Sequence, residues 1–506
     1  MPQPCLAVPL QIGALGITLV IGVLLEYAHV TWLPEAGVGV IVGALISGGH
    51  QLAGYDSMLE LQSFDFEFFM TWLLPPIIFE AGFNMNVKAF FKNFGPTMIF
   101  AFIGTFLSTF AVGGLVWKAG QMGLCYPMGM LASLTFGSLI SATDPVTVLA
   151  VFQALGVKVD LFSMVFGESV LNDAVAIVLS RTLLSFKEPG AVVNGESLGA
   201  ALVLFLTIFV GSMCIGIVAG FASSFVFKIL DLRRHDELIY TEGALSFVFP
   251  WMAYFAAEAL SWSGIVSIMF CGIIMASYTR SNFSPEAVTL TQRAYKCIAF
   301  VAETFVFVYL GLAIFAMPIF EATHWWLFAF ALGACFIGRL HIFLGSWLVN
   351  CLRKSEGDPT RNTCEPPKIS FTYMFIIWFS GLRGGVAFAL ASVSFGKNDF
   401  PEMCGGYHGF GCSAKAAGYT DSMAILQTTM LIAAFTIFVF GGSISHICKI
   451  CGVIATPEEK RAVEERQASE KKSGWHVFLE RKLTNASALK QALQHKRHVD
   501  SDVAML

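Results

Sequence analysis

Long apolar runs follow one another along most of the chain, separated by short polar segments. A helix needs roughly 17–25 mostly apolar residues to cross a bilayer. Thirteen runs qualify or come close: 5–27, 31–49, 66–83, 94–119, 127–155, 160–186, 197–230, 239–260, 263–279, 294–316, 324–350, 370–395 and 421–450. The pattern predicts an all-α polytopic membrane protein with about 13 transmembrane helices.

Residues beyond the last run have a different character. The segment starting at Thr456 is densely charged, and an apolar stripe follows at Trp475, Phe478, Leu479, Leu483, Leu489 and Leu493. Such a stripe is typical of an interfacial helix, and a loosely packed, partly disordered tail fits it as well. We therefore expect a transmembrane domain at 1–455 and a cytosolic tail at 456–506.

The basic residues of the loops predict the topology, because cytosolic loops are enriched in Lys and Arg. With the basic tail in the cytosol, one side holds Lys88, Lys92, Lys158, Lys228, Arg233, Arg234, Arg280, Arg293, Lys296, Arg353, Lys354, Arg361 and Lys368. The opposite side holds Lys118, Lys187, Lys397 and Lys415. Cys404 and Cys412 then lie outside the cytosol, where a disulfide and a free pair are both allowed.

Composition agrees with a membrane protein. Only 13% of the residues are charged and 56% are hydrophobic, whereas soluble domains contain about 25% charged residues. The 12 Cys residues show no spacing typical of a metal site.

Two of the runs contain interruptions. The fifth reads Thr143-Asp144-Pro145 in its middle, and the twelfth reads Gly381-Leu-Arg383-Gly384-Gly385. Proline removes a helical hydrogen bond and disfavours helical geometry in the residue before it, and clustered glycines weaken a helix. A proline kink and a glycine-rich packing seam are the structural alternatives to true breaks.

The spacing of the interruptions favours a transporter. They lie seven segments apart, so segments 2–6 and 9–13 form two five-helix units whose fourth member is broken. Crossed discontinuous helices at matching places in two inverted repeats are a transporter signature. Asp144 and Arg383 would neutralise the partial charges of the broken helix ends.

The sixth run carries a polar stripe between apolar flanks. Glu168 and Asn172, and likewise Ser169 and Asp173, are four residues apart and share a helix face. Carboxylates within the membrane are functional by default, and a fully paired structural ion pair is the alternative for each of them. We expect Asp173, Asn172, Ser169, Thr143 and Asp144 to form an ion site.

The chemistry of such a site is simple. Loss of water disfavours the charged form of a carboxyl group, so a proton and a cation compete for it near neutral pH. One Asp that binds either ion, but not both, couples their movement when access alternates between the two sides. Oxygen ligands suit Na⁺, K⁺ and Li⁺ alike, so the sequence leaves the preferred ion open.

Other buried charges are expected to be structural. Glu303 and Arg339 lie at similar depth in the tenth and eleventh runs, which predicts an ion pair between them. Arg383 is available as a partner for Glu168.

Several motifs resemble the eukaryotic sodium/proton exchangers, within the monovalent cation:proton antiporters. They are Ile140 to Gln153, Val165 to Val178, Leu74 to Glu80, Ala302 to Phe307 and Phe379 to Gly384. The resemblance spans roughly residues 30–450, and its wording at 143–153 and 168–181 is most similar to the endosomal and Golgi branch.

The resemblance implies a homodimer in which a six-helix core moves against a dimerisation domain. It implies that Asp173 binds the transported Na⁺, K⁺ or H⁺, that Glu168 pairs with Arg383, and that exchange is electroneutral because Asn172 precedes the Asp. It implies no cofactor, no nucleic-acid partner and a role in pH homeostasis.

A channel and a membrane enzyme are the two alternative function classes. A cation or proton channel would also need buried polar groups, but a single buried Asp beside two helix breaks favours a carrier. A membrane enzyme is more remote, because the chain has no His-Glu-x-x-His and no Gly-x-Ser-x-Gly motif.

Overall fold

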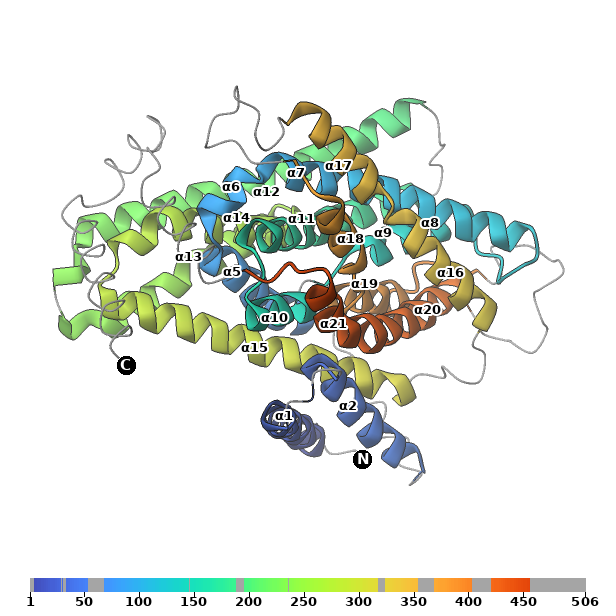
Figure 1. Ribbon diagram of the computed structural model, residues 1–506, viewed down its shortest axis with the longest axis horizontal. Coiled ribbons are helices and arrows are strands. Elements are labelled where there is room, and N and C mark those ends of the chain that lie inside the picture. The colour runs from blue at the N-terminus through green and yellow to red at the C-terminus, as the bar shows by residue number, and fades with distance from the viewer. Residues whose placement is uncertain are drawn as a thin grey trace. The chain divides into compact units, whose positions relative to one another are not determined.

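Helices carry the fold throughout the described part of the chain (Figure 1). The structure is a computed structural model, and it describes residues 4–28, 30, 33–52, 68–144, 146–187, 195–234, 236–316, 324–353, 368–402 and 420–455. Within these ranges the β structure is a single bridge between Val157 and Ile454. The predicted all-α fold class is confirmed. The Cys404–Cys412 pair and the apolar stripe of the tail lie outside the described residues.

The first half of the chain comprises α1 (Pro4–Tyr27), α2 (Glu35–Leu52), α5 (Leu74–Asn84), α6 (Val87–Lys92), α7 (Phe94–Met98), α8 (Gly104–Gln121), α9 (Met130–Ser141), α10 (Val146–Leu155), α11 (Val159–Leu184) and α12 (Gly195–Leu230). The second half comprises α13 (Ile239–Ala259), α14 (Gly264–Ile274), α15 (Pro285–Ala316), α16 (Trp325–Gly338), α17 (His341–Leu352), α18 (Phe371–Phe379), α19 (Gly385–Gly396), α20 (Asp421–Thr436) and α21 (Gly442–Ile450). Single π-helical turns at 69–73, 99–103, 275–279 and 437–441 connect α-helical stretches.

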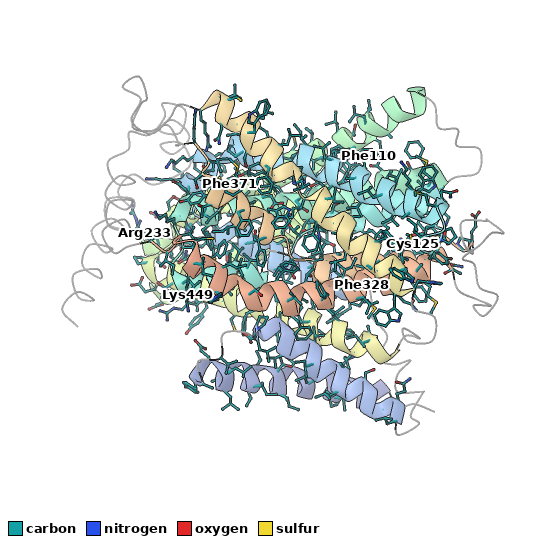
Figure 2. The ribbon with its side chains drawn as sticks, turned by 45° about the vertical axis from the view of Figure 1, so that its right-hand side comes forward. Phe110, Cys125, Arg233, Phe328, Phe371 and Lys449 are labelled. Carbon is teal, nitrogen blue, oxygen red and sulfur yellow. The ribbon has the colours of Figure 1, made fainter. Side chains whose placement is uncertain are left out.

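Many of these helices are long and apolar enough to cross a membrane. In the described residues eight continuous helices qualify: Pro9–Tyr27, Phe94–Gln121, Val159–Lys187, Gly199–Arg234, Gly264–Asn282, Pro285–Ile314, Trp325–Leu352 and Asp421–Ile450. The other predicted segments correspond to α2, α5 with its preceding π turn, α9 with α10, α13, and α18 with α19, which are shorter, interrupted or more polar. Large apolar side chains such as Phe110 and Phe371 lie exposed on the outside of the helices (Figure 2), as expected where lipid is the solvent.

The chain divides into two compact units. The first comprises the described parts of Met1–Phe69, Ala89–Leu202 and Glu303–Lys460, and the second those of Met70–Lys88 and Val203–Ala302. In the second unit α14 packs against α5 and α13. In the first, α8 packs against α9 and α16, α11 against α9, and α19 against α20. All the predicted ion-site residues belong to the first unit.

Glycines allow a close backbone contact in the first unit, between α8 and α9. A Cβ atom on Gly113 would meet the backbone of Ser133 and Leu134, and one on Gly137 would meet the backbone of Thr109 and Gly113. The two backbones therefore touch over a full helical turn, which fixes the position of α9 and of the break that follows it.

Both predicted interruptions are present. Helix α9 ends at Ser141 and α10 begins at Val146, while α18 ends at Phe379 and α19 begins at Gly385. These helices have between 9 and 12 residues, so each is about 14–18 Å long and too short to cross a hydrocarbon core of about 30 Å. The breaks touch, because the backbone N–H of Asp144 donates to the carbonyl oxygen of Leu382 at 2.9 Å.

Helix α11, which carries the polar stripe, lies inside the first unit. In its most apolar stretch 94% of the residues are buried. Its polar side chains therefore face protein rather than lipid. Irregular backbone at membrane depth is tolerated only in such protein-lined surroundings, and the two breaks lie against this helix.

Candidate functional site

The polar stripe of α11 is joined to the first helix break by hydrogen bonds. The Nδ2 atom of Asn172 donates to Oγ1 of Thr143 at 2.9 Å and to Oε1 of Glu168 at 3.2 Å. The hydroxyl of Thr143 donates to that of Ser169 at 3.3 Å. The four-residue spacing of Glu168 and Asn172 thus becomes a direct hydrogen bond. Thr143, in the first break, forms hydrogen bonds with both Ser169 and Asn172 of α11.

Asp173 is the most buried acid of the stripe without a salt bridge in the described structure. It is 2% exposed, and the backbone N–H of Thr143 donates to its carboxylate. Its Oδ1 atom, and Oδ1 of the neighbouring Asn172, have no hydrogen-bond partner among the described residues. Buried polar atoms are almost always paired. Two unpaired oxygens on successive residues, together with the hydroxyls of Thr143 and Ser169, are ligand types that suit a hard cation.

Glu168 is held by an arginine from another helix. Both of its oxygens accept hydrogen bonds from Arg339, from Nη1 at 3.2 Å and from Nη2 at 3.1 Å. Arg339 directly follows α16 and lies two residues before α17 begins. Its Nε and Nη2 also donate to the carbonyl oxygens of Ile377 and Trp378, so the same guanidinium closes the C-terminal end of α18.

Arg383 closes the end of the other broken helix. Its Nη1 donates to the carbonyl oxygens of Ser141 at 2.8 Å and Ala142 at 3.2 Å, which are orphan acceptors at the end of α9. A cation at a helix C-terminus is favourable because the helix dipole is negative there. The two arginines therefore serve the two C-terminal ends that the breaks leave inside the protein.

Asp144 lies against the opposite kind of helix end. Its carboxylate occupies the space next to Gly384, the residue that precedes α19, and a Cβ atom on Gly384 would overlap it. Helix N-termini carry partial positive charge and favour acids. A Cβ atom on Gly381 would overlap the side chain of Arg339 in the same way. The glycines of the second break thus make room for two charged side chains, beyond weakening the helix.

Two predicted ion pairs are corrected by this geometry. Glu168 pairs with Arg339 and not with Arg383, because the carbonyls at the end of α9 engage Arg383 while Arg339 offers both of its terminal nitrogens to the carboxylate. The predicted Glu303–Arg339 pair is also wrong, because the guanidinium of Arg339 donates to Glu168 and to the carbonyl oxygens at the end of α18. Glu303 is half-buried on α15, and similar depth along two helices is no measure of their separation in space.

Sequence reasoning missed several residues that support the site. The Oγ1 atom of Thr436 on α20 accepts a hydrogen bond from the backbone N–H of Arg383 at 3.1 Å and contacts its carbonyl oxygen. Asp421, at the start of α20, accepts from the hydroxyl of Tyr126 at 2.8 Å and from the N–H of Gly129. Asp421 gave no distinctive signal, since acids are common in the first turn of a helix. Thr436 gave none, because threonine is common in membrane helices.

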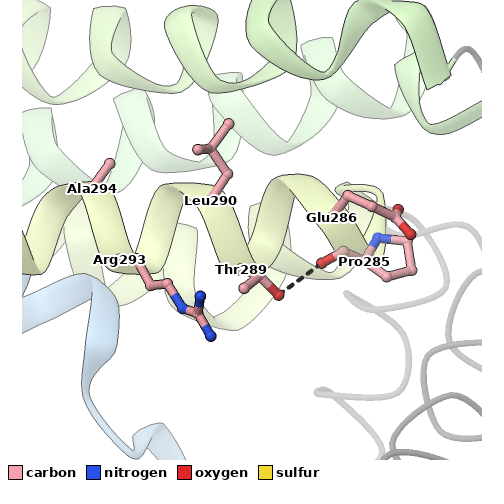
Figure 3. Close-up of a pocket in the computed structure, with 6 residues that line it drawn as sticks. All are labelled: Pro285, Glu286, Thr289, Leu290, Arg293 and Ala294. Atoms are coloured by element: carbon pink, nitrogen blue, oxygen red, sulfur yellow. Dashed lines mark hydrogen bonds between the residues drawn. The ribbon is translucent and has the colours of Figure 1, made fainter.

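A groove on the surface of α15 lies apart from these residues. It has a volume of about 660 Å³ and is lined by Pro285, Glu286, Thr289, Leu290, Arg293 and Ala294, all from α15 (Figure 3). In it Arg293 and Glu286 point away from each other, and Thr289 donates to the carbonyl oxygen of Pro285. None of the predicted ion-site residues lines it, so it is not the ion site.

Comparison with known proteins decides the family. The family model described as "Sodium/hydrogen exchanger, transmembrane" matches residues 15–450. The chain belongs to the sodium/hydrogen exchanger family. It is 37% identical over 449 residues to sodium/hydrogen exchanger 5 of Arabidopsis thaliana, covering 88% of this chain and 80% of that protein. It is 36% identical over 451 residues to sodium/hydrogen exchanger 8 of Rattus norvegicus, covering 87% of this chain and 71% of that protein.

The fold of this exchanger is also that of a solved relative. The structure of a sodium proton antiporter from Methanocaldococcus jannaschii at pH 8 matches with a TM-score of 0.63 at 18% identity, covering 88% of this chain and 100% of that chain. The chain is thus an antiporter of the membrane and not an enzyme. It uses no cofactor, and the cations and protons it exchanges are its substrates.

The corrected ion pair gives a first test. Glu168→Gln and Arg339→Gln should each lower the free energy of unfolding by about 3–5 kcal/mol, because each leaves a lone charge buried. The double variant leaves none, so its loss should fall short of the sum by about 1–3 kcal/mol. Thermal and chemical denaturation of the purified variants in detergent measures these losses. Glu168→Gln combined with Arg383→Gln is the matched control and should show the smaller coupling. A larger coupling for Glu168 with Arg383 would restore the pairing that the motifs imply.

Proposed function

We propose that this exchanger moves one Na⁺ or K⁺ against one H⁺ by alternating access at Asp173. The observation that carries the proposal is the pair of unpartnered oxygens, Oδ1 of Asp173 and Oδ1 of Asn172, beside the crossing of the two broken helices. In this view Asp173 binds either a proton or a dehydrated cation. Asn172 and the hydroxyls of Thr143 and Ser169 supply further oxygens to the cation, and Asp144 holds the N-terminal end of α19 near it.

The charges around Asp173 support electroneutral exchange. Glu168 is balanced by Arg339, and Asp144, when ionised, balances Arg383. The surroundings therefore have no net charge. Asp173 with a proton and Asp173 with a monovalent cation are both neutral, so the loaded site carries the same charge in both directions. Asn172 beside it adds an oxygen without adding a second titrating group.

A carrier is favoured over a channel by the contacts of the site. Thr143 forms a hydrogen bond to α11, and Asp144 forms one to the second break. Charged side chains occupy the space beside Gly381 and Gly384 in that break. These contacts must break and re-form when the site changes the side of the membrane to which it is open, as alternating access requires. A channel would give flux that does not saturate with cation concentration.

Further features of the proposal rest on the sequence. We propose 13 transmembrane helices in two inverted five-helix repeats, a transmembrane domain at 1–455 and a cytosolic tail at 456–506. The bias of Lys and Arg in the loops supports this orientation. The motif wording supports an endosomal or Golgi membrane, a homodimer and a role in pH homeostasis, with K⁺ as well as Na⁺ as a transported ion.

Asp173→Asn tests the role of the carboxylate. An amide cannot exchange a proton for a cation, so cation-dependent proton flux into liposomes should fall to the background of empty vesicles while the protein still folds. Asp160→Asn is the matched control, because Asp160 lies in the first turn of the same helix and pairs with Lys92 at the protein surface. It should retain the flux. Exchange at the wild-type rate in Asp173→Asn would remove Asp173 from the site.

Electroneutrality has its own measurement. The rate of Na⁺- or K⁺-driven proton flux in liposomes should stay the same when an ionophore clamps the membrane potential at positive, zero or negative values. Flux that rises with the potential in one direction and falls in the other would show that net charge crosses the membrane, and the one-for-one exchange would be wrong.

A further inference from the structure

Two helices of the first unit, α10 and α21, end in the same way. After α10, Gly156 has φ +65°, and the N–H groups of Gly156 and Val157 donate to the carbonyls of Gln153 and Phe152. After α21, Gly452 has φ +61°, and the N–H groups of Gly452 and Val453 donate to the carbonyls of Lys449 and Cys448. A left-handed glycine followed by an apolar residue that folds back is a common way to close a helix.

These two helix ends are bonded to each other. The N–H of Lys158 donates to the carbonyl of Val453 at 3.1 Å, and the N–H of Ala455 donates to the carbonyl of Gly156 at 3.0 Å. Val157 and Ile454 face each other between these bonds as an antiparallel bridge. We call the six residues 156–158 and 453–455 the clasp. Val157 and Val453 are buried within it, and α10 and α21 pack side by side behind it (Figure 1).

The clasp lies between α10 and α11 in the sequence, and both helices are connected to the proposed ion site. Helix α10 starts directly after the break that contains Asp144 and is 10 residues long, so about 15 Å of rigid helix separates the break from the clasp. Lys158 is also the N-cap of α11, the helix that carries Asp173. A shift of the clasp therefore moves the end of α10 and the start of α11 together.

The segment 421–455 holds the broken helix at its other end as well. Asp421 accepts from the N–H of Gly129, the residue that precedes α9. Thr436, midway along the segment, bonds to the backbone of Arg383 in the second break. A π-helical turn at 437–441 follows Thr436 directly, and such turns are rare and often lie at functional sites. One continuous segment thus fixes both ends of the α9–α10 pair and its crossing partner.

We propose that the clasp positions α10 for ion binding. While the clasp is closed, α10 holds Asp144 against Gly384 and the site has its full affinity for the cation. Opening the clasp frees α10 and weakens cation binding. The bridge consists of two hydrogen bonds, and Ile454 is 37% exposed, so the loss of one bond is enough to weaken the clasp. The proposal rests on the exchange function stated above.

Ala455→Pro opens the clasp at one atom, because proline has no N–H to donate to Gly156. Ala455→Ser keeps that N–H and is the matched control. With each protein in liposomes, Ala455→Pro should raise the apparent KM for the cation about two- to tenfold, the range expected for loss of one hydrogen bond, with little change in maximal flux. Hydrogen exchange of the amides at 146–158 should speed up in Ala455→Pro alone. Unchanged KM and unchanged protection in Ala455→Pro would overturn the proposal.

A disulfide across the clasp tests rescue. Val157 and Ile454 face each other without hydrogen bonds between them, the arrangement that brings side chains closest and within disulfide reach. Val157→Cys with Ile454→Cys, added to Ala455→Pro, should restore the wild-type KM when oxidised and lose it again when reduced. Ala455→Pro without the new cysteines, oxidised and reduced in the same way, should not respond. Failure of the cross-linked protein to regain its KM would show that the loss in Ala455→Pro has another cause.

The readouts separate this proposal from the function beneath it. If the wild-type protein shows no exchange in these liposomes, the proposed function is wrong. The hydrogen exchange of α10 still decides whether the clasp holds that helix, because it is measured without transport.

Discussion

The buried ends of the broken helices are the constraint on which the rest of the first unit depends. A helix that stops inside a membrane leaves carbonyl groups without partners and a partial charge at each end, and lipid satisfies neither. In this protein each C-terminal end is closed by an arginine, α9 by Arg383 and α18 by Arg339. Arg383 comes from the second break, and Arg339 comes from the junction of α16 and α17, so each buried end is closed by a residue from another helix.

The remaining charges follow from those two arginines. Buried guanidinium groups need counter-charges, and Glu168 lies against Arg339 while Asp144 lies at the N-terminal end of α19. Once these groups are placed, Asp173 is the acid whose Oδ1 has no partner among the described residues. The same arrangement that makes a break tolerable therefore leaves one carboxylate oxygen without a hydrogen-bond partner in the described structure. Gly381 and Gly384 are part of it, because any side chain there would displace a charged group.

Much of this was predictable from the sequence, and the limits have physical reasons. The breaks at Pro145 and at the glycines of 381–385, and the contact between Glu168 and Asn172, follow from local rules of helix geometry. Pairing between distant segments does not. Glu168 had two arginines within reach by depth, and only the three-dimensional placement of the α16–α17 junction selects Arg339. Arg383 was expected to neutralise a broken helix end, which its bonds to the carbonyls of α9 confirm, and also to pair with Glu168, which bonds to Arg339 instead. The clasp could not be predicted from the sequence, because it consists of backbone hydrogen bonds between residues almost 300 positions apart.

The central claim is that a proton and a cation compete for one carboxylate. Calorimetric titration of the purified protein with Na⁺ or K⁺, in buffers that differ in their ionisation enthalpy, measures how many protons leave for each cation bound. At pH values where Asp173 is mostly protonated, each bound cation should release nearly one proton. Asp173→Asn should release none. Cation binding that releases no protons at any pH would contradict it.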